Sequence, residues 1–313
     1  MNSTQATSAN KPRLLYPRRL PRRLLQSAAL LVTGAAVLGS VTIAVASDPA
    51  AAAEASDPAS AADVQEESSA WRSVSMAGDA LLTAIAPGTP WHLQLSGRLQ
   101  EKSWAKVYDI DLFDTSTSTI QSLRSRGKIV HCYFSAGSYE DWRSDKGSYP
   151  SSVLGKAMDG WPGERWVDIR STALRRVLQA RMDLAKSKGC HGIDPDNVDG
   201  YGHDTGFPLK ESDAVQFIKW LASEAHSRGL SVGLKNGIEI LSQVASSVDW
   251  AVNEQCNEYS ECAEYRSFIG SGKPVFNVEY KGTLSSICSR TKPLRISTIK
   301  APLSLNGPAE PCL

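Results

Sequence analysis

Short apolar or alternating segments recur along the chain from residue 91 onward, and most of them end in polar residues. Helix-like stretches separate several of these segments. The clearest are 171–188 and 211–228, and in the second one apolar residues recur at the three-to-four spacing of an amphipathic helix. Strands that alternate with helices predict a parallel sheet. The candidate strands are 91–95, 107–112, 129–134, 165–169, 191–197, 231–236, 250–255, 274–280 and 297–301.

This alternation predicts the α/β class and, within it, a (β/α)8 TIM barrel. Eight or nine strands in about 240 residues match the size of that fold, which usually needs about 250 residues. A doubly wound open sheet is the alternative, but it would usually carry a GxGxxG loop after its first strand, and none is present. Nine candidate strands compete for eight places, so one of them is extra. The connection between 91–95 and 107–112 is also too short for a full helix.

The first 70 residues do not have the pattern of a globular core. Residues 1–23 carry six basic groups and no acidic ones, and we assign them to the cytoplasm. The uncharged run 24–46 is long enough to cross a bilayer as a helix, so it is a signal anchor or a signal peptide cleaved after an Ala-x-Ala-like site that ends at Ala46. Its length favours the anchor. Residues 47–70, rich in Ala, Ser and acidic groups, form a disordered linker, and 71–313 form the catalytic barrel.

Charge and cysteine content refine this division. Without the charged groups of the first 70 residues, residues 71–313 are nearly neutral. They therefore lack the excess of positive charge that is typical of nucleic-acid-binding domains. All six cysteines follow the apolar run, and both interpretations of that run export them, which favours disulfides. Cys256 and Cys262 are close in sequence, and a Cys288–Cys312 bridge would pin the C-terminal tail. Cys132 and Cys190 remain as the third pair.

Acidic and amide side chains gather where the candidate strands end, which is where a TIM barrel builds its active site. No Ser-His-Asp order with a nucleophile elbow appears, so carboxyl groups are the available catalysts. Cleavage of a glycosidic bond needs two of them, one to protonate the leaving oxygen and one ionised as nucleophile or base. The other candidate contacts to substrate at these ends are Asp111, Asp114, Tyr139, Glu140, Asp168, Asp194, Asn197, Asp199, Tyr201, Lys235, Asn236 and Glu279.

Asp196 and Glu254 are the predicted catalytic pair, facing one another across the barrel mouth. We assign Asp196 as the ionised group and Glu254 as the proton donor, although the pair is firmer than the roles. Residues 194–200 superficially resemble a calcium loop, but Val198 and Asp199 stand where an EF-hand needs an oxygen ligand and a glycine. We therefore predict neither a metal nor a cofactor.

Six segments carry a family resemblance in the right order: 107–114, 132–140, 160–170, 192–201, 233–236 and 253–256. Together they resemble glycoside hydrolase family 114, the endo-α-1,4-polygalactosaminidases, from about residue 91 to residue 280. The resemblance implies a (β/α)8 barrel that cleaves α-1,4-linked galactosamine-containing polysaccharide. The family's catalytic Asp and Glu fall on Asp196 and Glu254. Asp194 departs from the Glu expected in many relatives, and the tail after residue 280 resembles the family least.

The resulting hypothesis is an endo-acting glycoside hydrolase, monomeric in its catalytic domain, that works outside the cell or on its surface. Its partners are the galactosamine polymer and, if residues 24–46 are retained, the membrane. The polymer is cationic wherever its amines are free, and acidic groups at the rim would attract it. The alternative hypothesis is a cell-surface carbohydrate-binding protein on an inactive barrel. The presence of both Asp196 and Glu254 favours the enzyme.

Overall fold

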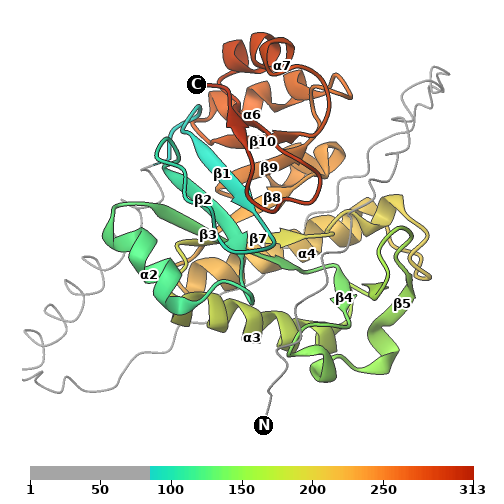
Figure 1. Cartoon of the computed structure of the whole chain (residues 1–313). Coiled ribbons are helices and arrows are strands. Elements are labelled where there is room, and N and C mark those ends of the chain that lie inside the picture. Colours follow the sequence, from blue (N-terminus) through green and yellow to red (C-terminus); the bar gives the residue numbers. More distant parts are fainter. Residues whose placement is uncertain (1–84) are drawn as a thin grey trace, which may run out of the picture. The chain divides into compact units, whose positions relative to one another are not determined.

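The computed structural model describes residues 85–313, and in it eight parallel strands curve into a barrel (Figure 1). The barrel closes where β1 contacts β11, and the backbone N–H groups of Leu95 and Ser96 donate to the carbonyl of Leu305 at 2.9 and 3.2 Å. The (β/α)8 TIM barrel is therefore confirmed. In spatial order its strands are β1 (Trp91–Gln94), β2 (Val107–Asp111), β3 (Ile129–Ser135), β7 (Gly192–Asp196), β8 (Ser231–Lys235), β9 (Trp250–Glu254), β10 (Val275–Glu279) and β11 (Ser297–Lys300), with β12 (Glu310–Pro311) antiparallel on β11.

The helices lie outside the strands (Figure 1). Both predicted helices form: α3 is Thr172–Lys188 and α4 is Glu211–Ser227. The hydroxyl of Ser171 caps the start of α3, and Gly189 ends it in the left-handed conformation at φ 90°. The remaining helices are α2 (Thr117–Ser125), α5 (Leu241–Val244), α6 (Arg266–Gly270) and α7 (Leu284–Thr291), with 3-10 turns at η1 (Lys146–Ser148), η2 (Ser151–Val153), η3 (Gly200–Gly202), η4 (Ile238–Ile240), η5 (Cys262–Tyr265) and η6 (Lys292–Leu294).

The extra strand among the nine candidates is 165–169, and its assignment to the barrel was wrong. The segment does form a strand, β6 (Glu164–Val167), but it pairs antiparallel with β4 (Ser138–Glu140) and β5 (Leu154–Ala157) in a separate small sheet. The barrel leaves no place for it, because β3 pairs directly with β7. Figure 1 shows this β4–β6 excursion, with β4 and β5 labelled, at the lower right near one end of α3.

Alternation along the strands divides the apolar side chains into a barrel interior and a layer between barrel and helices. The interior is tightly filled around Trp250, whose ring stacks on His131 at a centroid distance of 4.0 Å. Gly233 on the neighbouring strand makes room for this ring, because a Cβ there would lie 2.2 Å from Trp250 Cζ3. Burial lowers the pKa of His131 to about 3, so the imidazole packs as a neutral ring.

The three predicted disulfides are confirmed as Cys132–Cys190, Cys256–Cys262 and Cys288–Cys312. They suit an oxidising compartment. Between residues 85 and 313, no helix has both the length and the apolar character that crossing a bilayer requires. The predicted cytoplasmic segment, membrane segment and linker, residues 1–70, lie outside the described residues.

Candidate active site

Three of the predicted strand-end carboxyl groups, those of Asp194, Asp196 and Glu254, surround Lys235. Its side chain is 1% exposed, and its Nζ lies 3.5 Å from Asp196 Oδ2 and 3.8 Å from both Glu254 Oε2 and Asp194 Oδ2. Because β7, β8 and β9 are neighbours, one ammonium group can reach all three carboxyl groups. Asp196 and Glu254 therefore lie two strands apart, one on either side of Lys235.

Asp196 and Glu254 are the members of this group that solvent can reach, with side chains 13% and 19% exposed. Asp196 Oδ2 accepts a hydrogen bond of 2.8 Å from the hydroxyl of Tyr133, and its Oδ1 accepts one from the Asn197 backbone N–H. Glu254 accepts a hydrogen bond from the hydroxyl of Tyr280. Each of the two carboxyl groups is thus held by a tyrosine as well as by the lysine.

The backbone directly after these strands adopts an unusual conformation that orients the site. Asn197, Asn236 and Gln255 follow β7, β8 and β9 immediately, and all three have positive φ values of 61°, 54° and 70°. Asparagine tolerates this left-handed region better than most residues. Asn236 makes two hydrogen bonds to Glu254. Its Oδ1 accepts one from the Glu254 backbone N–H at 3.0 Å, and its Nδ2 donates one to Glu254 Oε2 at 3.1 Å.

Gly137, beside Asn197, is a second position that only glycine can occupy. A Cβ on Gly137 would lie 1.7 Å from the Asn197 carbonyl oxygen, so only glycine fits at the turn after β3. The backbone N–H groups of Ala136 and Gly137 donate to the carbonyl of Asp196 at 2.9 and 3.0 Å. The side-chain amide of Asn197 donates to Ser135 Oγ at 2.8 Å. These contacts fix the end of β7, and with it the direction of the Asp196 side chain.

Beneath the exposed pair lies a buried carboxyl pair, Asp109 and Asp194, both 0% exposed. Burial, followed by the charge of Asp194, raises the pKa of Asp109 well above its ordinary value, and burial raises the pKa of Asp194 to about 7. The protonated form of Asp109 is therefore favoured beside Asp194. Asp109 was not predicted, because the prediction rested on residues at strand ends. Asp109 and Asp111 are two residues apart on β2, so their side chains lie on the same face of the strand.

Asp111 and Glu140, predicted to contact substrate, belong instead to a buried ionic network at the start of the β4–β6 excursion. Arg143 donates to both oxygens of Asp111 at 2.9 and 2.6 Å and pairs with Glu140 at 3.0 Å. Arg181 pairs with Asp145 at 2.7 Å and lies 3.7 Å from Glu140. These acidic side chains are neutralised by arginine, so they add little negative potential at the rim.

The other predicted contacts lie apart from Lys235. The Asp114 side chain is 67% exposed, and the Tyr139 ring packs edge-on against Tyr149. Asp168 follows β6, not a barrel strand, and a hydrogen bond from Arg170 lowers its pKa. Asp199 lies 4.0 Å from His203, and Tyr201 donates to Glu239 at 3.1 Å. Glu279 is buried and accepts the backbone N–H groups of Asn257 and Glu258, so it anchors the loop after β9.

Among residues 85–313, one group of side chains has the proximity of metal ligands: Cys256, Cys262 and Glu279. The two sulfur atoms are bonded to each other, so the group offers no thiolate.

Comparisons with known proteins place this centre in a family. The sequence profile of Glycoside-hydrolase family GH114 matches residues 73–313, which is most of the chain. The chain belongs to family GH114. It is therefore a glycoside hydrolase, and the resemblance described above is confirmed.

Solved structures extend the comparison. The crystal structure of Aspergillus fumigatus Ega3 in complex with galactosamine is 43% identical in sequence, with a TM-score of 0.70, and the match covers 73% of this chain and 96% of that one. The glycoside hydrolase domain of PelA from Pseudomonas aeruginosa shares the fold, with 13% identity, a TM-score of 0.58, and coverage of 71% and 98%. An uncharacterised protein of Deinococcus radiodurans is 25% identical over 239 residues, which are 66% of this chain and 77% of that protein.

Proposed function

We propose that this GH114 enzyme is an endo-acting hydrolase of α-1,4-linked, galactosamine-containing polysaccharide, with Asp196 and Glu254 as its catalytic carboxyl groups. The observation that carries the proposal is that these two side chains, at the C-terminal ends of β7 and β9, are partly exposed and held by one buried lysine. Their oxygens cannot be further apart than the sum of the 3.5 and 3.8 Å distances to Lys235 Nζ. That sum lies inside the roughly 9.5 Å upper limit at which paired carboxyl groups cleave glycosidic bonds.

The charge of the centre supports an amino sugar as substrate. Asp194, Asp196 and Glu254 surround a single cation, Lys235. An excess of carboxyl groups over cations favours a substrate that carries ammonium groups. The similarity to Ega3, whose structure contains galactosamine, supports the same class.

Within this proposal, Glu254 protonates the glycosidic oxygen as the bond to C1 breaks, and Asp196 stabilises C1 as nucleophile or activates the attacking water. Asp196 is suited to the ionised role because Lys235, Tyr133 and the Asn197 N–H all direct positive charge or donors at its two oxygens. Water supplies the hydroxyl group on C1, its other proton is taken up by the carboxylate that acts as base, and the proton delivered by Glu254 leaves with the released chain end.

The decisive experiment compares Asp196→Asn and Glu254→Gln with the parent on a galactosamine polymer, with new reducing ends as the measurement. Each isosteric amide should lower turnover by several orders of magnitude, and the double variant should be little worse than either single one, because the two groups act as a unit. Asp159→Asn is the matched control, since Asp159 is exposed and lies outside the centre. Cleavage near the parent rate by either active-site variant contradicts the pair.

An activated substrate with a good leaving group separates the two roles. It needs no proton donor, so it should rescue Glu254→Gln far more than Asp196→Asn. The opposite order would exchange the roles. Binding of the polymer by the parent protein without new reducing ends would instead mean a carbohydrate-binding barrel without catalysis.

We also propose that the enzyme acts at the outside of the cell, either released or held by residues 24–46 as an anchor. The three disulfides support the compartment. The charge asymmetry around residues 24–46 supports the orientation.

A further inference from the structure

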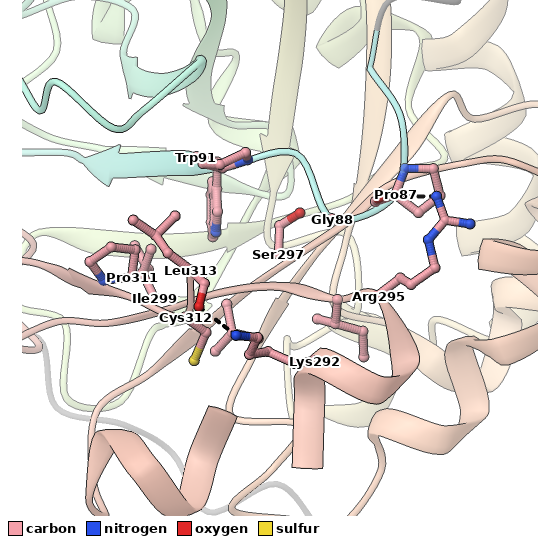
Figure 2. A pocket seen from close by; sticks show the side chains of 13 residues that line it. Pro87, Gly88, Trp91, Lys292, Arg295, Ser297, Ile299, Pro311, Cys312 and Leu313 are labelled. Carbon is pink, nitrogen blue, oxygen red and sulfur yellow. Dashed lines mark hydrogen bonds between the residues drawn. The ribbon is translucent and has the colours of Figure 1, made fainter. Parts of the chain in front are cut away.

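A cavity of about 370 Å³ lies at the opposite pole of the barrel from the carboxyl pair (Figure 2). It is lined by the N-terminal ends of β1 and β11, by η6, and by the last residues of the described chain, Pro311 to Leu313. Asp196 and Glu254 stand at the C-terminal ends of parallel strands, so the barrel interior separates the two places. A volume of this size is within the roughly 300–1,000 Å³ range of small-molecule sites.

Two buried polar groups line this cavity without a hydrogen-bond partner: the indole Nε1 of Trp91, in a side chain 1% exposed, and the hydroxyl of Ser297, 5% exposed. An indole N–H can only donate, and a hydroxyl can donate. A buried donor left unpaired is destabilising, so two of them in one cavity point to acceptor atoms of a ligand. Figure 2 shows both side chains among the lining residues.

Two cations border the same space. Arg295 directs Nη2 to the Pro87 carbonyl at 3.3 Å, the one hydrogen bond of its side chain among residues 85–313, which leaves most of its guanidinium N–H donors for another acceptor. Lys292 donates to the main-chain oxygen of Leu313. Within the described part of the chain no Asp or Glu side chain lines the cavity. Because Lys292 is paired with the main-chain oxygen of Leu313, Arg295 supplies the positive charge that is left for a ligand.

The remaining wall is apolar and covalently fixed. Pro87, Pro90, Ile299 and Leu313 present carbon atoms to the cavity. The wall formed by residues 311–313 is held in place by the disulfide between Cys312 and Cys288 of α7. A fixed wall keeps the cavity formed before a ligand arrives.

We propose that this cavity is a second ligand site, separate from the hydrolytic centre, for a small amphiphilic anion. An oxyanion group, carboxylate or phosphate, accepts hydrogen bonds from Arg295, Ser297 and the Trp91 indole. An apolar ring or chain lies against the prolines and Ile299. The donor set and the missing acidic side chains select for the anion, and the apolar wall selects against a fully hydrated inorganic ion.

The test is a titration of the full-length protein with phenyl phosphate and, separately, with benzoate, followed through the indole N–H signals in ¹H–¹⁵N correlation spectra. Trp91→Phe identifies the Trp91 signal. We expect a saturable shift of that signal with at least one probe, and the tighter probe tells phosphate from carboxylate. No saturable shift of the Trp91 signal with either probe in the millimolar range overturns the proposal.

Variants then tie the binding to the named donors. Arg295→Asn, which suits the left-handed backbone at φ 57°, should raise the Kd about tenfold or more, because it removes a charged donor. Ser297→Ala should raise it about two- to tenfold. Arg290→Gln removes the same charge from the exposed face of neighbouring α7 and should leave the Kd unchanged.

The indole signals that do not respond to the probe report whether each variant is folded. If Arg295→Asn does not fold, the affinity of Ser297→Ala tests the site in its place. Equal affinity in the parent and in a folded Arg295 or Ser297 variant contradicts the site. Asp196→Asn should bind the probe as the parent does. A loss of binding in that variant would mean that the probe occupies the hydrolytic centre, which also overturns the proposal.

Discussion

Replacing Asp194 by Asn should abolish a specific pH dependence of stability. Burial raises the pKa of Asp194 from 3.8 to about 7 in the folded protein. In the unfolded chain the group ionises near its ordinary value, so between about pH 4 and pH 7 the folded state binds more protons than the unfolded state. The free energy of unfolding therefore falls as pH rises through this window, and it levels off above it.

The size of this effect follows from the same shift. About three pH units at about 1.4 kcal/mol each give an upper limit of about 4 kcal/mol lost between pH 4 and pH 7. Coupling to Asp109 reduces it, since a carboxyl pair titrates as a unit. The amide of Asp194→Asn cannot ionise, so the variant should match the parent near pH 5 and exceed its stability by about 1–3 kcal/mol at pH 8.

Urea unfolding at half-unit steps from pH 5 to pH 8 measures this difference, provided that fluorescence and circular dichroism give coincident transitions. Asp159→Asn, on the exposed surface, is the control and should keep the pH dependence of the parent. If Asp194→Asn retains the parent slope, Asp194 is already ionised in the folded protein at pH 5, and burial does not raise its pKa.

Three further changes test the barrel and its N-terminal extension. Gly233→Ala places a Cβ 2.2 Å from the Trp250 ring and should lower the free energy of unfolding by about 1–3 kcal/mol, whereas Gly270→Ala, with open space around it, should change little in the same urea assay. Replacing Cys132 and Cys190 by Ala opens a loop of 58 residues and should destabilise the protein by about 4 kcal/mol in thermal or urea unfolding. If residues 24–46 are an anchor, the protein should pellet with membranes and resist carbonate extraction, and a mature N-terminus at Ser47 in the medium would contradict that.

The barrel was predictable because its pattern is repeated, and the errors arose where a single segment had to be judged alone. Strand 165–169 has the alternation of any half-buried strand, and that pattern does not say which sheet a strand joins. Its place in the small sheet follows from the direct pairing of β3 with β7, which is a long-range contact. Asp168 was consequently assigned to a barrel rim that its strand does not reach.

The candidate site was predictable at its centre and less so at its edge. Strand-end position selected Asp194, Asp196, Lys235, Asn236 and Glu254, which the structure brings together. The same criterion selected Asp111 and Glu140, whose arginine partners come from residues 143 and 181. Ion pairs between distant segments leave no periodic signal in a sequence. Asp109 and Tyr133 were missed because they lie below or beside the strand ends, facing inward.

The protonation of the buried pair, Asp109 and Asp194, determines which carboxyl groups share the positive charge of Lys235. Were Asp109 and Asp194 both ionised, Lys235 would be shared among four carboxylates, and its charge would be divided over the buried as well as the exposed groups. Because burial favours the protonated form of Asp109 and raises the pKa of Asp194 to about 7, the charge of Lys235 acts mainly on the carboxyl groups that solvent reaches. A hydrolase with two carboxyl groups needs one of them protonated and the other ionised. In the proposed mechanism Lys235, 3.5 Å from Asp196 and 3.8 Å from Glu254, adds its charge to the Tyr133 and Asn197 donors that favour the ionised form of Asp196.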